Sequence, residues 1–90
     1  MKTAREIEIQ DLVIKKLVDN DISPFSVTCT FESGHEGLIG ITFWLNSDLY
    51  EFLDILDYKN QCDKSGYIIL SDNNTVLLFG MALFNLYTRL

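Results

Sequence analysis

The chain carries one histidine and two cysteines, and His35 is the best placed of these residues to do catalytic chemistry. It lies between glycines in SGHEG (residues 33–37), with Glu32 and Glu36 beside it. A histidine oriented by a carboxylate acts as a general base when it faces a nucleophile. No serine or cysteine of the sequence has a recognisable nucleophile setting. We therefore interpret His35 as an exposed loop residue and expect no enzymatic activity.

Metal and phosphate sites are not supported by the spacing of the other polar residues. One histidine and the widely separated Cys29 and Cys62 do not form a tetrahedral zinc set. Residues 72–74 match the start of a calcium loop, but the glycine and the terminal glutamate of such a loop are missing. Segment 33–37 lacks the lysine of a phosphate-binding loop. We expect no cofactor and no bound metal.

Carboxylates form the most regular pattern in the sequence. In NSDLYEFLDILDYKN (residues 46–60) an acidic residue occurs at every third position, and two tyrosines lie among them: Asp48, Glu51, Asp54 and Asp57, with Tyr50 and Tyr58. From Leu17 to Tyr58 the chain has eight acidic residues and neither lysine nor arginine. Soluble domains usually mix the two signs of charge, so this segregation is informative.

A helix over 48–60 spreads these carboxylates over about half of its circumference, because a spacing of three drifts by about 60° per step. The opposite side is predicted to pack on the core and consists of Leu49, Phe52, Leu53 and Leu56. We interpret the acidic side as a docking face for a basic protein, with Glu32 and Glu36 as accessory charges and the tyrosines as contact area. The alternative interpretation is that an acidic protein simply has acidic helix faces.

The formal net charge of −6 and the pI of about 4.4 indicate the class of partner. Direct binding to nucleic acid or to an anionic membrane needs clustered lysine and arginine, so both are disfavoured. The expected partner is a basic protein, such as a nucleic-acid-binding enzyme. Small acidic inhibitors encoded by phages and mobile elements, including DNA mimics and anti-CRISPR proteins, have this size and charge, as do some toxin-neutralising immunity proteins. The chain resembles these groups in size and charge only, and no motif assigns it to a family.

The first residues and the cysteines predict a cytoplasmic protein. Residues 1–6 carry mixed charge rather than the apolar run of a signal peptide. Two cysteines do not make a disulfide framework, so both thiols are expected to be reduced. The longest apolar run, residues 76–84, is well short of the ~20 residues that a membrane-spanning helix needs.

A single domain of residues 1–90 must position these side chains, because 90 residues leave no room for a second domain. Apolar periodicities predict an α+β fold in the order α-β-β-α-β-α, with helices packed on a small three-stranded antiparallel sheet. The elements are predicted at residues 4–19, 25–32, 38–45, 48–60, 67–71 and 75–89. The alternative is a four-stranded sheet with a second hairpin at 67–80.

The two faces of the predicted hairpin differ in composition. Alternate residues of strand 25–32, from Phe25 to Phe31, are predicted to face the core, and strand 38–45 is expected to be central in the sheet. The second face of strand 38–45 is also rather apolar and includes Trp44, which is a candidate binding hot spot if it is exposed. Because a short chain has a thin core, a homodimer or complex subunit that uses Trp44 and the apolar C-terminal segment is a second hypothesis.

Overall fold

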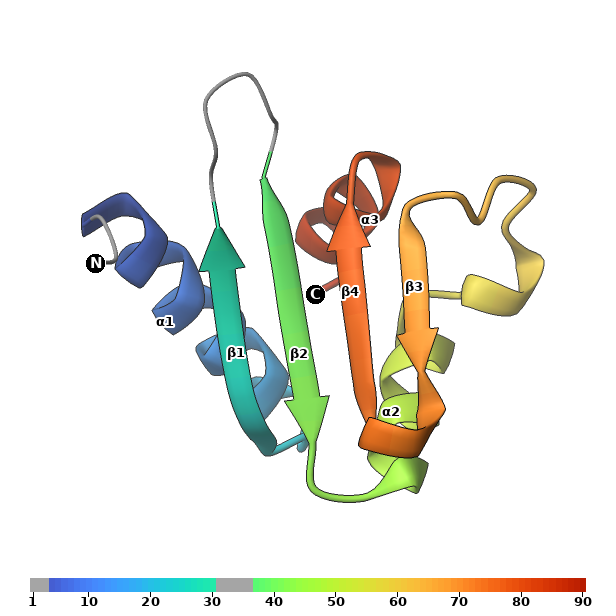
Figure 1. Ribbon diagram of the computed structural model, residues 1–90, viewed down its shortest axis with the longest axis horizontal. Coiled ribbons are helices and arrows are strands. Elements are labelled where there is room, and N and C mark those ends of the chain that lie inside the picture. The colour runs from blue at the N-terminus through green and yellow to red at the C-terminus, as the bar shows by residue number, and fades with distance from the viewer. Residues whose placement is uncertain (1–3, 31–36) are drawn as a thin grey trace.

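The structure, a computed structural model, describes residues 4–30 and 37–90. The described residues form three α-helices and a four-stranded antiparallel sheet (Figure 1), which confirms the predicted α+β class. The elements follow one another as α1 (Ala4–Asp19), β1 (Pro24–Thr30), β2 (Leu38–Phe43), α2 (Asn46–Ile55), the short 3-10 turn η1 (Tyr58–Asn60), β3 (Tyr67–Leu70), the 3-10 turn η2 (Ser71–Asn73), β4 (Thr75–Phe79) and α3 (Met81–Arg89).

The strand order is β1-β2-β4-β3, and every neighbouring pair is antiparallel. β2 is central, as predicted, and of the two predicted sheets the four-stranded one with a hairpin inside 67–80 is present. The prediction of one helix over 75–89 is wrong, because this range forms β4 and then α3. Val76 and Leu78 pair with Ile41 and Ile39 of β2, so contacts from distant residues override the local helical pattern.

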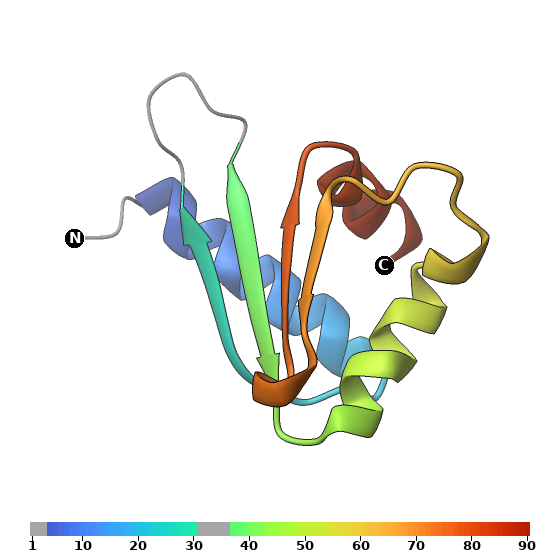
Figure 2. The ribbon, with the colours of Figure 1, turned by 45° about the vertical axis from the view of Figure 1, so that its right-hand side comes forward.

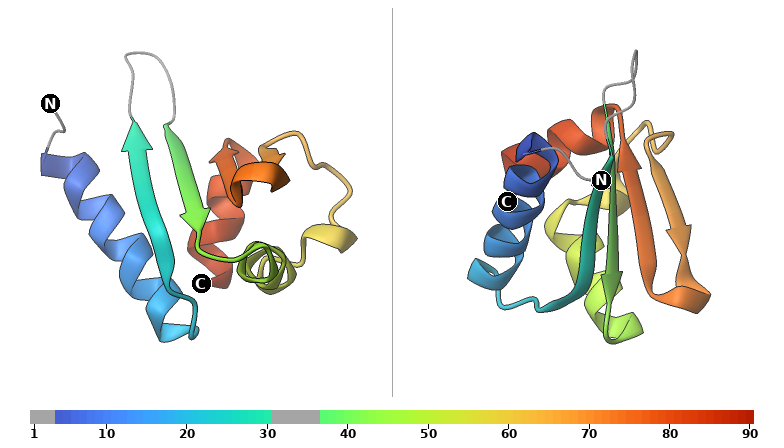
Figure 3. Two further views of the ribbon diagram at one scale, coloured as in Figure 1. Left: turned by 60° about the horizontal axis from the view of Figure 1, so that its bottom comes forward. Right: turned by 60° about the vertical axis from the view of Figure 1, so that its left-hand side comes forward.

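All three helices pack on the same face of the sheet (Figures 2 and 3). No described helix covers the other face, which we call the outer face. Its apolar side chains alternate along the strands with those of the core and are Leu38, Ile68, Leu70, Leu77 and Phe79. The molecule therefore consists of two layers, with the core between them.

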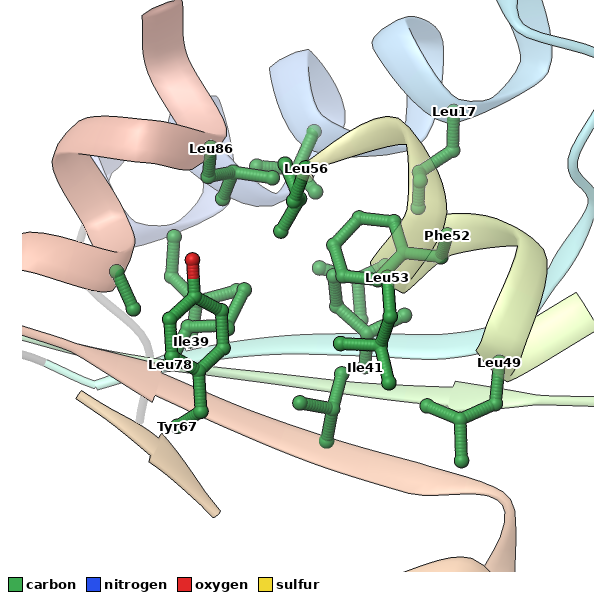
Figure 4. Packing of buried hydrophobic residues seen from close by; sticks show 14 of the residues in the cluster. Leu17, Ile39, Ile41, Leu49, Phe52, Leu53, Leu56, Tyr67, Leu78 and Leu86 are labelled. Atoms are coloured by element: carbon green, nitrogen blue, oxygen red, sulfur yellow. The ribbon is translucent and has the colours of Figure 1, made fainter. Parts of the chain in front are cut away.

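The core lies between the helices and the inner side of the sheet. Figure 4 shows side chains from α1, α2 and α3 meeting those of the strands, including Leu17, Phe52 and Leu86 over Ile39 and Ile41. Each fully buried side chain of this size contributes about 1.5–3 kcal/mol relative to exposure. The predicted core face of α2 is confirmed, since its four apolar residues are all buried.

Helix α1 has the predicted bounds, but less of it is buried than its apolar residues indicate. Val13 and Leu17 are buried, together with the carboxylate residue Glu6. Ile7, Ile14 and other apolar residues of this helix are exposed. The reason is that α1 packs mainly against β1 at the edge of the sheet, where only one side of the helix finds a partner.

The end of predicted strand 38–45 and the register of predicted strand 25–32 differ in the structure, and both differences change which side chains are exposed. β2 ends at Phe43 rather than at residue 45, and Leu45 is exposed. Phe25 is also exposed, because the register between β1 and β2 shifts between Pro24 and Ser26. Such a bulge breaks the alternation that predicted Phe25 in the core. Phe31 lies outside the described residues.

Among the helices that the structure describes, none is both long enough and apolar enough to cross a membrane.

Candidate functional site

The carboxylates of α2 lie on its solvent side, as the sequence pattern predicts. Glu51 and Asp54 are exposed and Asp48 is partly exposed. Within residues 4–30 and 37–90, none of these three carboxylates forms an ion pair with the lysines or arginines of the chain. We call this side the acidic face of α2. Its negative charge is available to a partner.

Asp57 and Tyr58 do not belong to this face, because α2 ends earlier than predicted. Asp57 adopts a left-handed conformation with φ of 56° and accepts a hydrogen bond from Asn60 Nδ2 at 2.7 Å. Tyr58 packs edge-on against Tyr67 with a centroid distance of 4.8 Å, and Lys64 Nζ lies 5.0 Å from the centroid of its ring. Tyr58 is therefore a residue of the core margin rather than of the acidic face.

The predicted accessory charges lie in a segment without a structural description. Glu32, Glu36 and His35 fall within residues 31–36, which are outside the described residues.

The N-terminus of α2 is held by a network of asparagines instead of a side-chain cap. Leu45 is the N-cap residue and makes no side-chain cap hydrogen bond, although residues 46–48 (Asn, Ser and Asp) are of types that often cap helices. Asn46 Nδ2 instead donates to Ser71 O at 3.1 Å and to Asn74 Oδ1 at 3.2 Å. Asn74 Nδ2 in turn donates to Trp44 O at 3.4 Å. These bonds tie loop 44–45, α2 and η2 together.

Three exposed aromatic residues belong to segments at the end of the sheet that this network holds, which are the start of β1, the loop after β2 and the first half of α2 (Figure 1, bottom). Trp44 is 62% exposed and Phe25 is 56% exposed, and their rings meet edge to face with centroids 4.6 Å apart. Tyr50 is 48% exposed, and its hydroxyl lies 3.4 Å from Ser71 Oγ. We call Phe25, Trp44 and Tyr50 the aromatic end. Large exposed aromatic residues at one place are typical of a binding surface.

The aromatic end adjoins the acidic face of α2, since Tyr50 and Asp48 are both in the first half of this helix. The sequence pattern identified Trp44 and Tyr50 as candidates. It missed Phe25, whose exposure depends on the bulge in β1, and it missed the two asparagines that hold the loops. Asn74 adopts a left-handed conformation with φ of 53°, which asparagine tolerates, so its residue type was a signal for this turn in the sequence.

Catalytic or metal-binding geometry is not apparent in the part of the chain that the structure describes. There, no three histidine, cysteine, aspartate or glutamate residues lie close enough to hold a metal ion. Cys29 is buried and Cys62 is exposed, and no disulfide joins them. The shifted pKa values have local causes: hydrogen bonds from Ser65 lower the pKa of Asp63, and burial raises the pKa of Tyr87. Neither residue belongs to the acidic face.

A scan of protein families, a search of curated proteins and a search of solved structures each returned no match for the chain.

Proposed function

We propose that the chain is a non-enzymatic protein-binding module that docks onto a basic surface of another protein. The observation that carries this proposal is the position of the aromatic end directly beside the acidic face of α2. The aromatic residues supply rigid contact area, which dominates the binding energy of most interfaces. The carboxylates steer the approach of a cationic partner and select against acidic ones.

The charge spacing of α2 supports a partner that normally binds nucleic acid. Asp48, Glu51 and Asp54 are three residues apart, which corresponds to one carboxylate per about 4.5 Å of helix. One strand of DNA carries one phosphate per about 3.4 Å. A groove lined with lysine and arginine for a nucleic-acid backbone would therefore meet a comparable density of negative charge on α2. Inhibition of a nucleic-acid-handling enzyme by DNA mimicry, as in inhibitors from phages or mobile elements, is the specific form that we propose, with toxin neutralisation as its alternative.

A pair of charge reversals tests the acidic face. Immobilised wild-type chain, Glu51→Lys/Asp54→Lys and the control Glu8→Lys/Asp11→Lys are exposed to one lysate of the cells that encode the protein. The control reverses two exposed acids of α1 with the same spacing and the same change in net charge. A basic protein retained by the wild type and by the control is expected to bind the α2 variant at least about tenfold more weakly, since the partner's cations lose their counter-charges.

Two further measurements make the result decisive. Melting curves of all three chains are expected to agree closely, because exposed substitutions have small effects on stability. Duplex DNA is expected to compete with the chain for the captured protein if the partner's nucleic-acid groove is the docking site. Equal loss of binding in both reversal variants would refute a role specific to α2. A lack of competition by DNA would refute DNA mimicry but would not contradict the docking of a basic protein on the acidic face of α2.

A structural or regulatory subunit is the second candidate function. It is favoured by one observation, which is that the sheet leaves its outer face without a covering layer among the described residues.

A further inference from the structure

The outer face of the sheet carries a continuous group of large apolar side chains. The strand register places Leu38 beside Phe79 and Leu77 beside Ile68. Ile68 is 44% exposed and Phe79 is 37% exposed, although both are in regular strands. Monomeric proteins rarely expose extended apolar patches, and those that occur usually mark an interface.

The hydroxyl groups in the middle of the outer face already have partners within the chain. Thr42 Oγ1 lies 2.9 Å from Thr75 Oγ1, which donates to Asn73 O at 2.9 Å. Thr28 Oγ1 donates to Gly40 O at a longer 3.4 Å. A hydroxyl that loses water without gaining a partner costs free energy, whereas a paired one does not. These three hydroxyl groups therefore do not oppose burial of the centre of the face.

At Gly40, in the centre of the outer face, the missing side chain leaves no groove. A Cβ atom at this position would lie 2.9 Å from Thr28 Oγ1 and 3.1 Å from Leu77 Cδ2. The side chains of Thr28 on β1 and Leu77 on β4 therefore occupy the space beside Gly40, so the surface of the sheet is flat at this point. Two sheets with such faces pack about 10 Å apart.

The charge distribution favours a second copy of this chain as the occupant. β1, β2, β3 and β4 contain no charged residue, although the chain has a net charge of −6. Two copies that meet through their outer faces bring no like charges into contact, and their acidic helices remain on the far sides of both sheets. Contact between the helix layers would instead oppose carboxylates, which is costly.

The exposed apolar residues of α1 form a weaker candidate surface. Ile7, Ile14 and Val18 are exposed on this helix. Asp11 and Lys15 are exposed between them, so each turn of α1 also carries a charge. A charged surface of this kind is typical of a helix face in water, whereas the strands have none.

The area of the outer face is at the lower limit of what a dimer requires. Four strands about 4.8 Å apart, with about five residues each at about 3.3 Å, give a flat footprint of roughly 300 Å². Phe25 and Trp44 add roughly 200 Å², since each aromatic side chain carries about 150–250 Å². The sum of roughly 500 Å² per copy is below the ~800 Å² of a standard interface, so the dimer needs the entire face and the aromatic pair and is expected to be weak.

We propose that the chain forms a two-fold homodimer in which the outer faces of two sheets pack against each other. The helices of both copies then lie on the outside, and Leu77 and Ile68 form the centre of the interface. The same patch serves both copies, as a closed two-fold contact requires. The dimer does not use the carboxylates of α2, so its test does not depend on the partner assigned to the acidic face, although both contacts include Phe25 and Trp44.

Sedimentation analysis of three chains tests the dimer. The wild type is expected to pass from monomer to dimer between about 1 and 200 µM, since an interface below the standard size forms a weak complex. Ile68→Lys/Phe79→Lys is expected to raise the Kd roughly 100-fold or more, because each copy would bury two unpaired charges. The control Val18→Lys/Phe84→Lys makes the same types of change at exposed positions of α1 and α3 and is expected to keep the wild-type Kd.

Several outcomes overturn the proposal. They are a wild type that remains monomeric at the highest concentration, an outer-face variant that dimerises like the wild type, and a helix-layer control that loses the dimer. Circular dichroism checks that each variant is folded. If the lysine variant is unfolded, Ile68→Thr/Leu70→Thr replaces it, because threonine is favoured in strands and still removes apolar area from the face. An unchanged Kd in that folded variant then refutes the interface.

Discussion

The side chains of Asn46 and Asn74 hold the loops of the candidate site together. Asn46, the first residue of α2, donates hydrogen bonds to Ser71 O and to Asn74 Oδ1. Asn74 turns the chain in a left-handed conformation, bonds to Trp44 O and accepts a hydrogen bond from Phe43 N at 2.8 Å. A loop held in this way keeps its exposed aromatic side chains ordered before binding, which reduces the entropic cost of an interface.

The titration of Asp63 can be tested at the residue scale. The backbone N–H of Ser65 donates to Asp63 Oδ1 at 2.9 Å, and this bond, with a smaller contribution from the Ser65 side chain, lowers the pKa of Asp63 from its ordinary 3.8. In Ser65→Ala, NMR titration of the carboxyl carbon is expected to give a pKa above that of the wild type but still below the ordinary value. The backbone donor, which is the larger cause, remains in this variant.

The pH dependence of stability follows from the direction of this shift. Because the folded-state pKa of Asp63 lies below the unfolded-state value, the hydrogen bond stabilises the fold above pH 3.8 and its contribution is lost as the pH falls through the folded-state pKa. The acid side of the stability curve is expected to be less steep in Asp63→Asn than in the wild type. Identical acid slopes in the two chains, measured by denaturant unfolding, would contradict this account.

At the scale of elements, Gly80 separates the last strand from the last helix. Its φ of 57° and ψ of −128° are conformations that other residues rarely adopt, and it serves as the N-cap of α3. Residues 76–84 form one continuous apolar run in the sequence. The boundary between β4 and α3 within this run lies at Gly80. The same residue that weakens a helix over 75–89 therefore permits a strand and a helix.

Substitution of Gly80 by alanine is expected to lower the free energy of unfolding by about 1–3 kcal/mol. An added Cβ meets no atom within 4 Å, so the loss comes from the backbone conformation alone. In Gly66→Ala, by contrast, the Cβ would also collide with Phe79 O and Ala82, and a larger loss is expected. Urea denaturation of both variants and of the surface control Ser47→Ala measures the difference. A Gly80→Ala chain as stable as the wild type would show that the junction is not strained for other residues.

At the scale of the whole molecule, charge and apolar surface lie on opposite sides. The acidic face of α2 belongs to the helix layer, and the outer face of the sheet has no charged residue in any strand. The two proposed contacts therefore rely on different forces: the partner contact uses the carboxylates of α2, the dimer uses the strands, and both include Phe25 and Trp44. A dimer formed through the sheets presents two acidic faces to a partner with two sites, which increases its overall affinity.

The two contacts are expected to respond in opposite directions to salt. Raising the ionic strength from about 50 to about 500 mM shortens the screening length well below its ~10 Å at 0.1 M. Screening weakens the attraction between α2 and a basic partner, so the Kd of that complex is expected to rise. It also weakens the repulsion between two copies of net charge −6, so the Kd of the dimer is expected to fall or to stay constant. Sedimentation and partner titration at both ionic strengths measure the two values, and a dimer that dissociates in high salt would contradict an apolar interface.

The sequence alone determined the features that depend on local pattern. The bounds of α1, the core face of α2, the central position of β2 and the acidic solvent side of residues 48–54 all follow from the spacing of apolar and charged residues along the chain. Spacing predicts these features because a helix or strand repeats its orientation at a fixed interval.

Only the tertiary structure decided the features that depend on distant residues. Residues 75–79 became a strand because β2 offered them an unpaired edge, and Phe25 became exposed because its register against Phe43 slips at a bulge. α2 ended at Ile55 and left Tyr58 to pack on Tyr67. The placement of all three helices on one side left the outer face apolar and uncovered. Pairing and packing energies of this kind arise between residues far apart in the chain, so no local period in the sequence records them.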